Sequence, residues 1–198
     1  MRKNTPSASS KNGFIRIIGG KYRGRKLPVK DVEGLRPTTD RVKETLFNWL
    51  MQDIRDATVL DCFAGSGGLG FEALSRFAAT VTFIERDKSA AQQIEANMAA
   101  IKTTNARVIQ SDVLTTTQTQ ATQQYDLVFV DPPFRKALAA TICTQLETNG
   151  WLAKEAIIYI EVEQELELNV PENWRLYKEK RRAKWPIACF YESNYLVF

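Results

Sequence analysis

Short apolar runs alternate with longer amphipathic stretches from residue 58 to the end of the chain. The runs predict strands at 58–63, 81–85, 107–109, 125–130 and 156–162. Helical spacing of apolar residues predicts helices at 69–77, 89–101 and 136–146. Two final strands, at least partly antiparallel, are expected at 174–180 and 187–198, and the polar segment 115–124 is expected to be a surface connection. The whole pattern predicts an α/β protein with a mostly parallel, doubly wound sheet.

The first part of the chain follows a different pattern. Residues 1–12 are polar without periodicity and are expected to form a disordered tail. A strand at 14–18 is expected to turn at Gly19 and Gly20 and to return as a second strand at 21–23, and a helix is expected to end near Gln52. These features predict a tail at 1–12, a hairpin and helix extension at 13–52, and a main domain at 53–198.

Positive charge is concentrated at the amino-terminal end. Residues 1–43 hold twelve Lys and Arg against three acidic residues, which leaves the rest of the chain with a net charge of −5. A second basic cluster lies near the other end, at Arg175, Lys178, Lys180, Arg181, Arg182 and Lys184. Two basic patches on a mildly acidic body indicate contacts with a polyanion such as a phosphate backbone. The alternative is a solvated surface with a disordered tail.

Several residue types exclude classes of chemistry and location. Histidine is absent, and the three cysteines, Cys62, Cys143 and Cys189, form no Cys-x-x-Cys pair. We therefore expect no metal site, reduced core thiols, and catalysis by carboxylates, backbone groups or a cofactor. No apolar stretch is long enough to span a membrane, and the amino terminus lacks the apolar core of a signal peptide. A cytoplasmic protein without membrane contact is expected.

A glycine-rich loop follows the first predicted strand of the main domain. Gly65, Gly67 and Gly70 match the spacing of a dinucleotide-binding turn, and Glu85 ends the next strand twenty residues after Gly65. An acid at that place binds ribose hydroxyls in dehydrogenases and in methyltransferases, so the glycines alone do not separate the two classes. Asp61, just before the loop, would repel a pyrophosphate and attract the ammonium of a methionine moiety.

A second motif, Asp131-Pro132-Pro133-Phe134, follows the strand predicted at 125–130. Ligands of open α/β sheets bind beyond the carboxyl ends of the strands, so this motif is expected to face the same crevice as the glycine loop. The alternative is a Pro-Pro pair that merely ends a strand.

The combination of these motifs resembles a known family. The 61–70 loop, Glu85 and the 131–134 motif are similar to class I methyltransferases that act on exocyclic amino groups. The segments 14–20, 23–25 and 35–47 further resemble the RsmD family of bacterial small-subunit (16S) ribosomal RNA guanine-N2 methyltransferases. The resemblance covers about 14–198. It departs from the family pattern at Gly68 and in the 184–186 stretch.

This resemblance implies a Rossmann-like fold with a seven-stranded sheet, an antiparallel strand at the carboxyl-terminal end, and S-adenosylmethionine as the cofactor. The implied cofactor contacts are Asp61, Phe63, Gly65, Gly67, Glu85 and Asp112. Asp112 would accept a hydrogen bond from the adenine amine, and a surface loop residue is its alternative role. Cys62 is interpreted as a core residue rather than a nucleophile.

The resemblance also implies how the substrate is handled. Asp131 and the Pro132 carbonyl would orient a guanine amine, and Phe134 would stack on an extruded base. The RNA-binding candidates are Arg16, Lys21, Arg23, Arg25, Lys26 and Arg36. The expected partner is ribosomal RNA, either free or within an assembled small subunit, bound by a monomer.

Three other functions remain open at this point. An adenine-N6 methyltransferase would use nearly the same Asp-Pro-Pro-aromatic motif. A nicotinamide-dependent dehydrogenase shares the glycine spacing but has no need of that motif. A non-catalytic ribosome-assembly factor would explain the basic patches and would not depend on Asp131.

Overall fold

A seven-stranded sheet forms the centre of the described part of the chain, with the strand order β5-β4-β3-β6-β7-β9-β8. The computed structural model describes residues 13–30, 39–133, 138–162, 169–182 and 185–193. The strands of this sheet are β3 (Thr58–Asp61), β4 (Thr80–Glu85), β5 (Ala106–Gln110), β6 (Tyr125–Val130), β7 (Leu152–Val162), β8 (Trp174–Arg182) and β9 (Trp185–Ser193). Strands β3 to β7 are parallel, and β9 is antiparallel to β7 and β8. The predicted mostly parallel sheet with an antiparallel end is confirmed.

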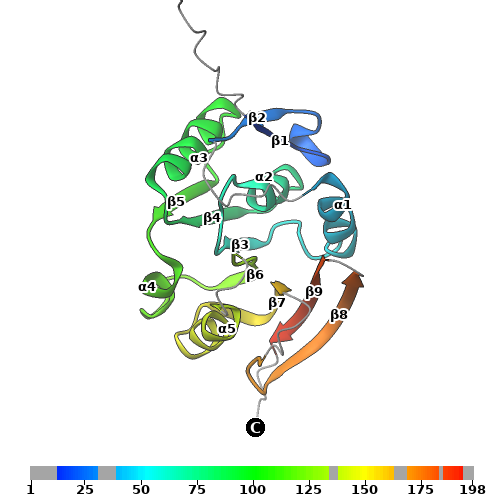
Figure 1. The fold of residues 1–198 in the computed structure, drawn as a ribbon, viewed down its shortest axis with the longest axis vertical. Helices are drawn as coiled ribbons and strands as arrows, with labels where there is room; N and C mark the ends of the chain where they lie inside the picture. Colours follow the sequence, from blue (N-terminus) through cyan, green and yellow to red (C-terminus); the bar gives the residue numbers. More distant parts are fainter. Residues whose placement is uncertain (1–12, 31–38, 134–137, 163–168, 183–184, 194–198) are drawn as a thin grey trace, which may run out of the picture.

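Helices cover both faces of this sheet (Figure 1). The first face is covered by α1 (Asp40–Trp49), α2 (Gly68–Ser75) and α3 (Lys88–Ala100), and the second by α4 (Val113–Thr117) and α5 (Leu138–Thr148). In strand β6 the residues 127–130 are all apolar and buried. Leu127 and Phe129 pack into the core under the first group of helices, whereas Val128 and Val130 pack into the core under the second. A strand buried on both faces needs apolar residues at every position.

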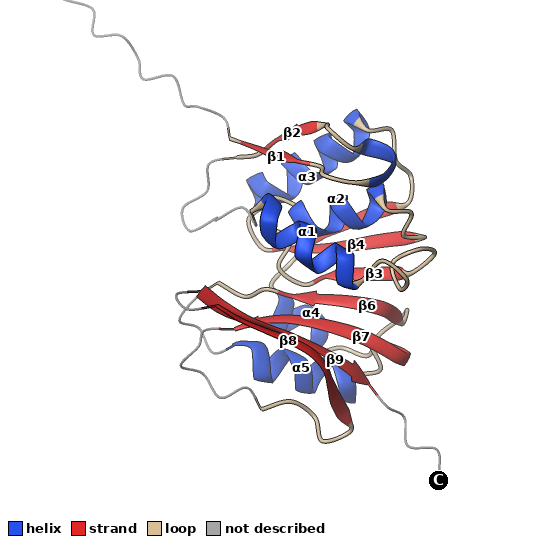
Figure 2. Ribbon diagram, turned by 90° about the vertical axis from the view of Figure 1, so that its right-hand side faces the viewer, coloured by secondary structure: helices blue, strands red, loops and turns tan. Residues whose placement is uncertain are grey.

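A two-stranded antiparallel hairpin of β1 (Phe14–Arg16) and β2 (Lys26–Pro28) lies beyond α2 and α3 (Figure 2). The prediction of a return strand at 21–23 is wrong, because the 3-10 turn η1 (Gly20–Tyr22) occupies that place. The cause is docking onto α2. Gly20 has a φ of +71°, and a Cβ there would lie 1.8 Å from the Ser75 carbonyl oxygen, so the chain bends around the end of α2.

Two further expectations differ from the structure. The helix expected to reach Gln52 ends at Trp49. The segment 115–124 is not wholly a surface connection, because α4 extends to Thr117 and the Thr117 side chain is buried. In the described part of the chain, no helix combines the length and apolar character needed to cross a membrane.

The hairpin shares its hydrophobic core with the main sheet. Ile15, Ile17 and Leu27 are buried in the same cluster as residues of β3, β4 and α2. Buried polar groups add to this contact, because the Ile18 N–H donates to Glu72 at 2.9 Å and the Tyr22 N–H donates to the Ser75 hydroxyl at 2.8 Å. The division between 13–52 and 53–198 stays a prediction, and one core runs across it.

The fully buried Glu72 is expected to be important for stability. Its carboxylate accepts from the Ile18 N–H and from Arg76 Nε, each at 2.9 Å. Glu72→Ala leaves both donors without this acceptor, so the free energy of unfolding should fall by about 2 kcal/mol or more in denaturant titration. The exposed Glu95 on α3 provides the control, since Glu95→Ala should change it by no more than about 0.5 kcal/mol. Equal effects of the two substitutions would contradict the docking role of Glu72.

Candidate active site

The carboxyl ends of β3, β4 and β6 bring three predicted acids to one edge of the sheet. Asp61 ends β3 and pairs in register with Phe83 on one side and with Phe129 on the other. Glu85 follows Phe83 by two residues, and Asp131 follows Phe129 by two. The parallel register therefore places these carboxylates beyond neighbouring strand ends, where open α/β sheets bind ligands.

The amides of the glycine loop are bonded within the protein. The Gly65 N–H donates to Glu85 Oε2 at 2.7 Å, and the Gly70 N–H donates to Asp61 Oδ2 at 3.1 Å. The Gly67 N–H donates to the Ala64 carbonyl. A dinucleotide-binding loop needs such amides for a pyrophosphate. Because carboxylates accept two of these bonds here, the loop is better suited to a cationic ligand.

Gly67 shows why the loop requires glycine. It has a φ of +79° at the amino end of α2, and a Cβ would lie 2.7 Å from the Phe71 ring. A side chain here would combine backbone strain with a steric clash. The turn therefore brings the chain close to Phe71 while the next residues enter the helix.

Asp61 is 2% exposed, and its pKa is raised to about 7, chiefly by this burial. The negative charge of Glu85 contributes to this rise in the pKa, while hydrogen bonds from the backbone of Gly70 and Phe63 oppose it. Its bond to Gly70 places the carboxylate at the first turn of α2, where the helix dipole favours negative charge. Asp61 thus holds the start of α2, and its contact with a cofactor stays a prediction.

Asp131 is half-buried directly after β6. Burial, the charge of Glu161 and the charge of Asp61 together raise its pKa well above the usual range. Glu161 lies near the carboxyl end of β7, and its carboxylate accepts from the Tyr159 hydroxyl at 2.9 Å. The sequence prediction missed Glu161, although the rule that selected Asp131 applies equally to the end of the strand predicted at 156–162.

Two other predicted cofactor contacts have structural roles of their own. Asp112 follows β5 and caps α4, because its Oδ1 accepts from the Leu114 N–H at 2.9 Å. Its Oδ2 lies 3.9 Å from Arg86 Nη1. Phe63 is half-buried against the core of the second face. Glu85 in turn accepts from the Asp87 N–H at 2.7 Å, so both of its oxygens organise loops at this edge.

The predicted cysteines behave as core thiols where they are described. Cys62 and Cys143 are buried, and burial raises the pKa of both thiols, that of Cys143 to about 12. A thiol with a raised pKa is a poor nucleophile. The side chain of Cys189 lies outside the described part of the structure.

The basic candidates of the hairpin fall into two groups. Arg16 and Lys26 are opposite each other in the β1–β2 register. The other three, Lys21, Arg23 and Arg25, lie around η1 near the ends of α2 and α3, where Arg25 donates to the Ala100 carbonyl at 3.2 Å. The side chains of all five basic residues are exposed, whereas Ile15, Ile17 and Tyr22 are buried. Phe134 and Arg36 lie outside the described residues.

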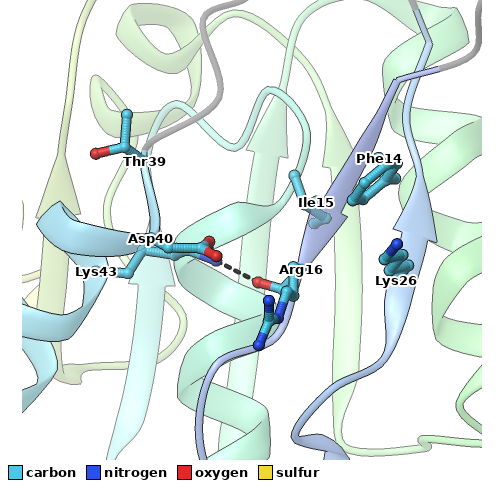
Figure 3. A pocket seen from close by; sticks show the side chains of 7 residues that line it. All are labelled: Phe14, Ile15, Arg16, Lys26, Thr39, Asp40 and Lys43. Atoms are coloured by element: carbon cyan, nitrogen blue, oxygen red, sulfur yellow. Dashed lines mark hydrogen bonds and ion pairs between the residues drawn. The ribbon is translucent and has the colours of Figure 1, made fainter.

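A cavity of about 330 Å³ lies between the hairpin and the start of α1 (Figure 3). The residues that line it are Phe14, Ile15, Arg16, Lys26, Thr39, Asp40 and Lys43. Only Arg16 and Lys26 among them were predicted as site residues. The others escaped prediction because the cavity depends on how the hairpin sits against α1, which no local pattern encodes.

Comparisons with known proteins agree with this architecture. The profile of the family described as "Conserved hypothetical protein 95" matches residues 15–191. The chain is 57% identical over 181 residues to ribosomal RNA small subunit methyltransferase D of Escherichia coli (strain K12), covering 91% of this chain and 89% of that protein. The protein of the same name from Haemophilus influenzae is 52% identical, with coverages of 89% and 91%.

Solved structures show the same fold. The putative methyltransferase yhhF from Escherichia coli has a TM-score of 0.85 at 50% identity, covering 92% of this chain and 99% of that one. A putative methyltransferase complexed with SAH has a TM-score of 0.69 at 12% identity, covering 96% and 58%.

The fold, with a candidate site at the carboxyl ends of its parallel strands, is therefore that of a Rossmann-like methyltransferase. The chain belongs to the ribosomal RNA small subunit methyltransferase D family, and the resemblance found in the sequence is confirmed.

The raised pKa of Asp61 predicts a pH-dependent stability. Between the ordinary value of 3.8 and the raised value of about 7, the folded chain keeps a proton that the unfolded chain releases. The free energy of unfolding should therefore fall as pH rises through this window, by up to about 1.4 kcal/mol per pH unit from this group. Asp61→Asn removes that titration, so denaturant unfolding at several pH values should show a shallower decline.

The exposed Asp53 after α1 provides the matched control. Asp53→Asn should retain the decline of the unsubstituted protein between pH 4 and 7. A decline that persists unchanged in Asp61→Asn would show that Asp61 is not the titrating group.

Proposed function

We propose that this chain transfers a methyl group from S-adenosylmethionine to the exocyclic N2 amine of a guanine in small-subunit (16S) ribosomal RNA. The observation that carries the proposal is the position of Asp131-Pro132-Pro133 directly after β6, beside the end of β3 where the glycine loop begins. Family membership supports the reaction class, since the relatives are named small-subunit ribosomal RNA methyltransferases. In this proposal the protein acts as a monomer in the cytoplasm.

The residues at the sheet edge fit S-adenosylmethionine by their chemistry. Its ammonium and sulfonium are cationic, and Asp61, Glu85 and Asp131 supply carboxylates at neighbouring strand ends. Glu85 would accept from the ribose hydroxyls, and Asp112 from the adenine amine, with Phe63 and the glycine loop alongside. When bound, the cofactor supplies a methyl group already activated by the positive charge on sulfur. The SAH complex of a protein with the same fold agrees with this assignment.

The same features weigh against a nicotinamide cofactor. A pyrophosphate carries negative charge and needs free backbone amides, whereas Gly65 and Gly70 donate theirs to Glu85 and Asp61. The acids of this edge would repel it. A dehydrogenase is therefore the weaker interpretation of the glycine spacing.

Asp131 is assigned the role of orienting the target amine. The lone pair of guanine N2 is conjugated with the ring, so the protein must accept the amine hydrogens and turn the lone pair toward the methyl group. The Asp131 carboxylate and the Pro132 carbonyl are the proposed acceptors, and Phe134 is the proposed stacking partner of the base. In its ionised form, Asp131 is also the proposed acceptor of the proton that the amine loses.

Asp131→Asn tests this assignment. Loss of the carboxylate should lower methyl transfer to small-subunit ribosomal RNA or subunits by at least about a hundredfold, the scale of one positioned catalytic group. Affinity for S-adenosylhomocysteine in calorimetry should stay nearly unchanged. The control is Asp126, which lies near the amino end of β6 and accepts a hydrogen bond from the Thr58 N–H. Asp126→Asn should keep normal turnover.

The product identifies the base. Mass spectrometry of nucleosides from the treated RNA should show N2-methylguanosine, and N6-methyladenosine would instead assign the adenine reaction. Normal turnover by Asp131→Asn would overturn the proposed role of this residue. Failure of the unsubstituted chain to methylate either RNA or subunits, together with normal subunit assembly by Asp131→Asn in cells, would favour an assembly factor.

The basic turn of the hairpin is proposed to contact phosphates of the RNA. Because the hairpin shares the main core, substitutions test this better than truncation does. Replacing both Lys21 and Arg23 by Ala should lower the salt slope of RNA binding by about 1.4–1.8, since each phosphate contact contributes about 0.7–0.9. The control pair, Arg55→Ala with Lys154→Ala, removes exposed cations elsewhere and should leave the slope unchanged. An unchanged slope in the first pair would exclude this contact.

A further inference from the structure

The cavity between the hairpin and α1 has walls fixed by buried contacts. Lys43 is 2% exposed, its ammonium donates to the Arg16 carbonyl, and it lies 3.3 Å from Asp40 Oδ1. Figure 3 shows these groups meeting across the space between α1 and β1. The buried ammonium therefore joins the two walls, and the cavity is formed before any ligand arrives.

The cavity is lined by both positively and negatively charged side chains. Three cations, Arg16, Lys26 and Lys43, line the cavity together with one carboxylate, Asp40, and the Thr39 side chain adds a hydroxyl. An excess of cations favours an anionic ligand such as a phosphate. The carboxylate in the same cavity is an acceptor for an amine or amide N–H of the ligand.

Phe14 adds an aromatic surface to this lining. Its side chain is 53% exposed, and the Lys26 ammonium lies 4.5 Å from the centre of its ring. A cation that can pair with a phosphate is thus adjacent to a ring that can take a base. Stacking platforms next to basic side chains are how proteins bind unpaired nucleotides.

The hairpin wall of the cavity lies toward the end of α2 that adjoins the glycine loop. Ile18 bonds Glu72 and Tyr22 bonds Ser75, so the chain from β1 to η1 runs in the same direction as α2. The first residues of α2 adjoin the glycine loop. The start of β1, which carries Phe14, therefore lies toward the loop end of α2 rather than the end contacted by η1.

We propose that this cavity binds an unpaired nucleotide of the substrate RNA other than the one that is methylated. Its base stacks on Phe14, its phosphate pairs with Arg16 and Lys26, and Asp40 accepts from an N–H of the base. This inference rests on the proposed function and adds a second nucleotide to it. It makes the cavity a determinant of which RNA sequence is bound.

Two substitutions at Phe14 separate stacking from apolar packing. Phe14→Leu keeps apolar bulk but removes the π face, and Phe14→Trp keeps the face. In fluorescence anisotropy with a labelled single-stranded oligoribonucleotide of mixed sequence, Phe14→Leu should weaken binding by at least about fivefold, the lower end of base–aromatic stacking. Phe14→Trp should bind as well as the unsubstituted protein. Melting temperature and affinity for S-adenosylhomocysteine should stay the same in both.

The chain offers a matched control in Phe77. It is 45% exposed, and Arg55 lies 4.8 Å from the centre of its ring, so the pair resembles Phe14 and Lys26. Phe77 follows the carboxyl end of α2, opposite the loop end. Phe77→Leu should leave RNA affinity unchanged. Equal RNA affinity of Phe14→Leu and Phe77→Leu would overturn the inference.

A charge variant and a competitor complete the test. Lys26→Gln should reduce the salt slope of RNA binding by about 0.7, whereas Phe14→Leu should leave the slope unchanged.

Adenosine and guanosine monophosphates should compete only weakly with the oligoribonucleotide for the protein. Competition as strong as that of the unlabelled oligoribonucleotide would instead make the cavity a site for free nucleotides. If the unsubstituted chain methylates RNA and both Phe14 variants bind RNA with the affinity of the unsubstituted protein, only this inference fails. If the unsubstituted chain neither binds nor methylates RNA, the proposed function fails with it.

Discussion

The bond between the buried Asp61 carboxylate and the Gly70 N–H is the contact on which the rest of the structure depends. It holds the start of α2 against the end of β3, and the Glu85 carboxylate fixes the loop between them through Gly65. The other half of α2 then presents Glu72 and Ser75 to the hairpin. One short helix thus connects the sheet edge that is suited to a cationic cofactor with the basic segment that is suited to a polyanion.

Opposite charges are concentrated in these two regions, the sheet edge and the hairpin. Acids gather at the strand ends, where burial and mutual repulsion raise the pKa values of Asp61 and Asp131. Cations gather on the hairpin and around the cavity beside α1. A negatively charged RNA is therefore attracted more strongly to the hairpin and the cavity than to the strand ends. Such a field favours binding in which the backbone stays outside while an uncharged base enters.

The sequence predicted those parts of the fold and the site that local patterns encode. The apolar run of β6, the glycine loop and the acids at strand ends all follow from period and position, and the structure places them as expected. The course of the hairpin was predicted wrongly, because the bend at Gly20 is imposed by Ser75, a residue far along the chain. The cavity was missed for the same reason, since Lys43 joins α1 to a backbone carbonyl 27 residues earlier.

The shared core of the hairpin also determines the order in which the chain can fold. A hairpin with two three-residue strands cannot hold its own structure in water. Its buried partners Glu72 and Ser75 come 54 and 53 residues after the amides that they bind. The hairpin therefore cannot complete its buried contacts until α2 has been synthesised and has packed on β3. The part of the protein proposed to recognise ribosomal RNA is thus synthesised before α2 and packs only after α2 has formed.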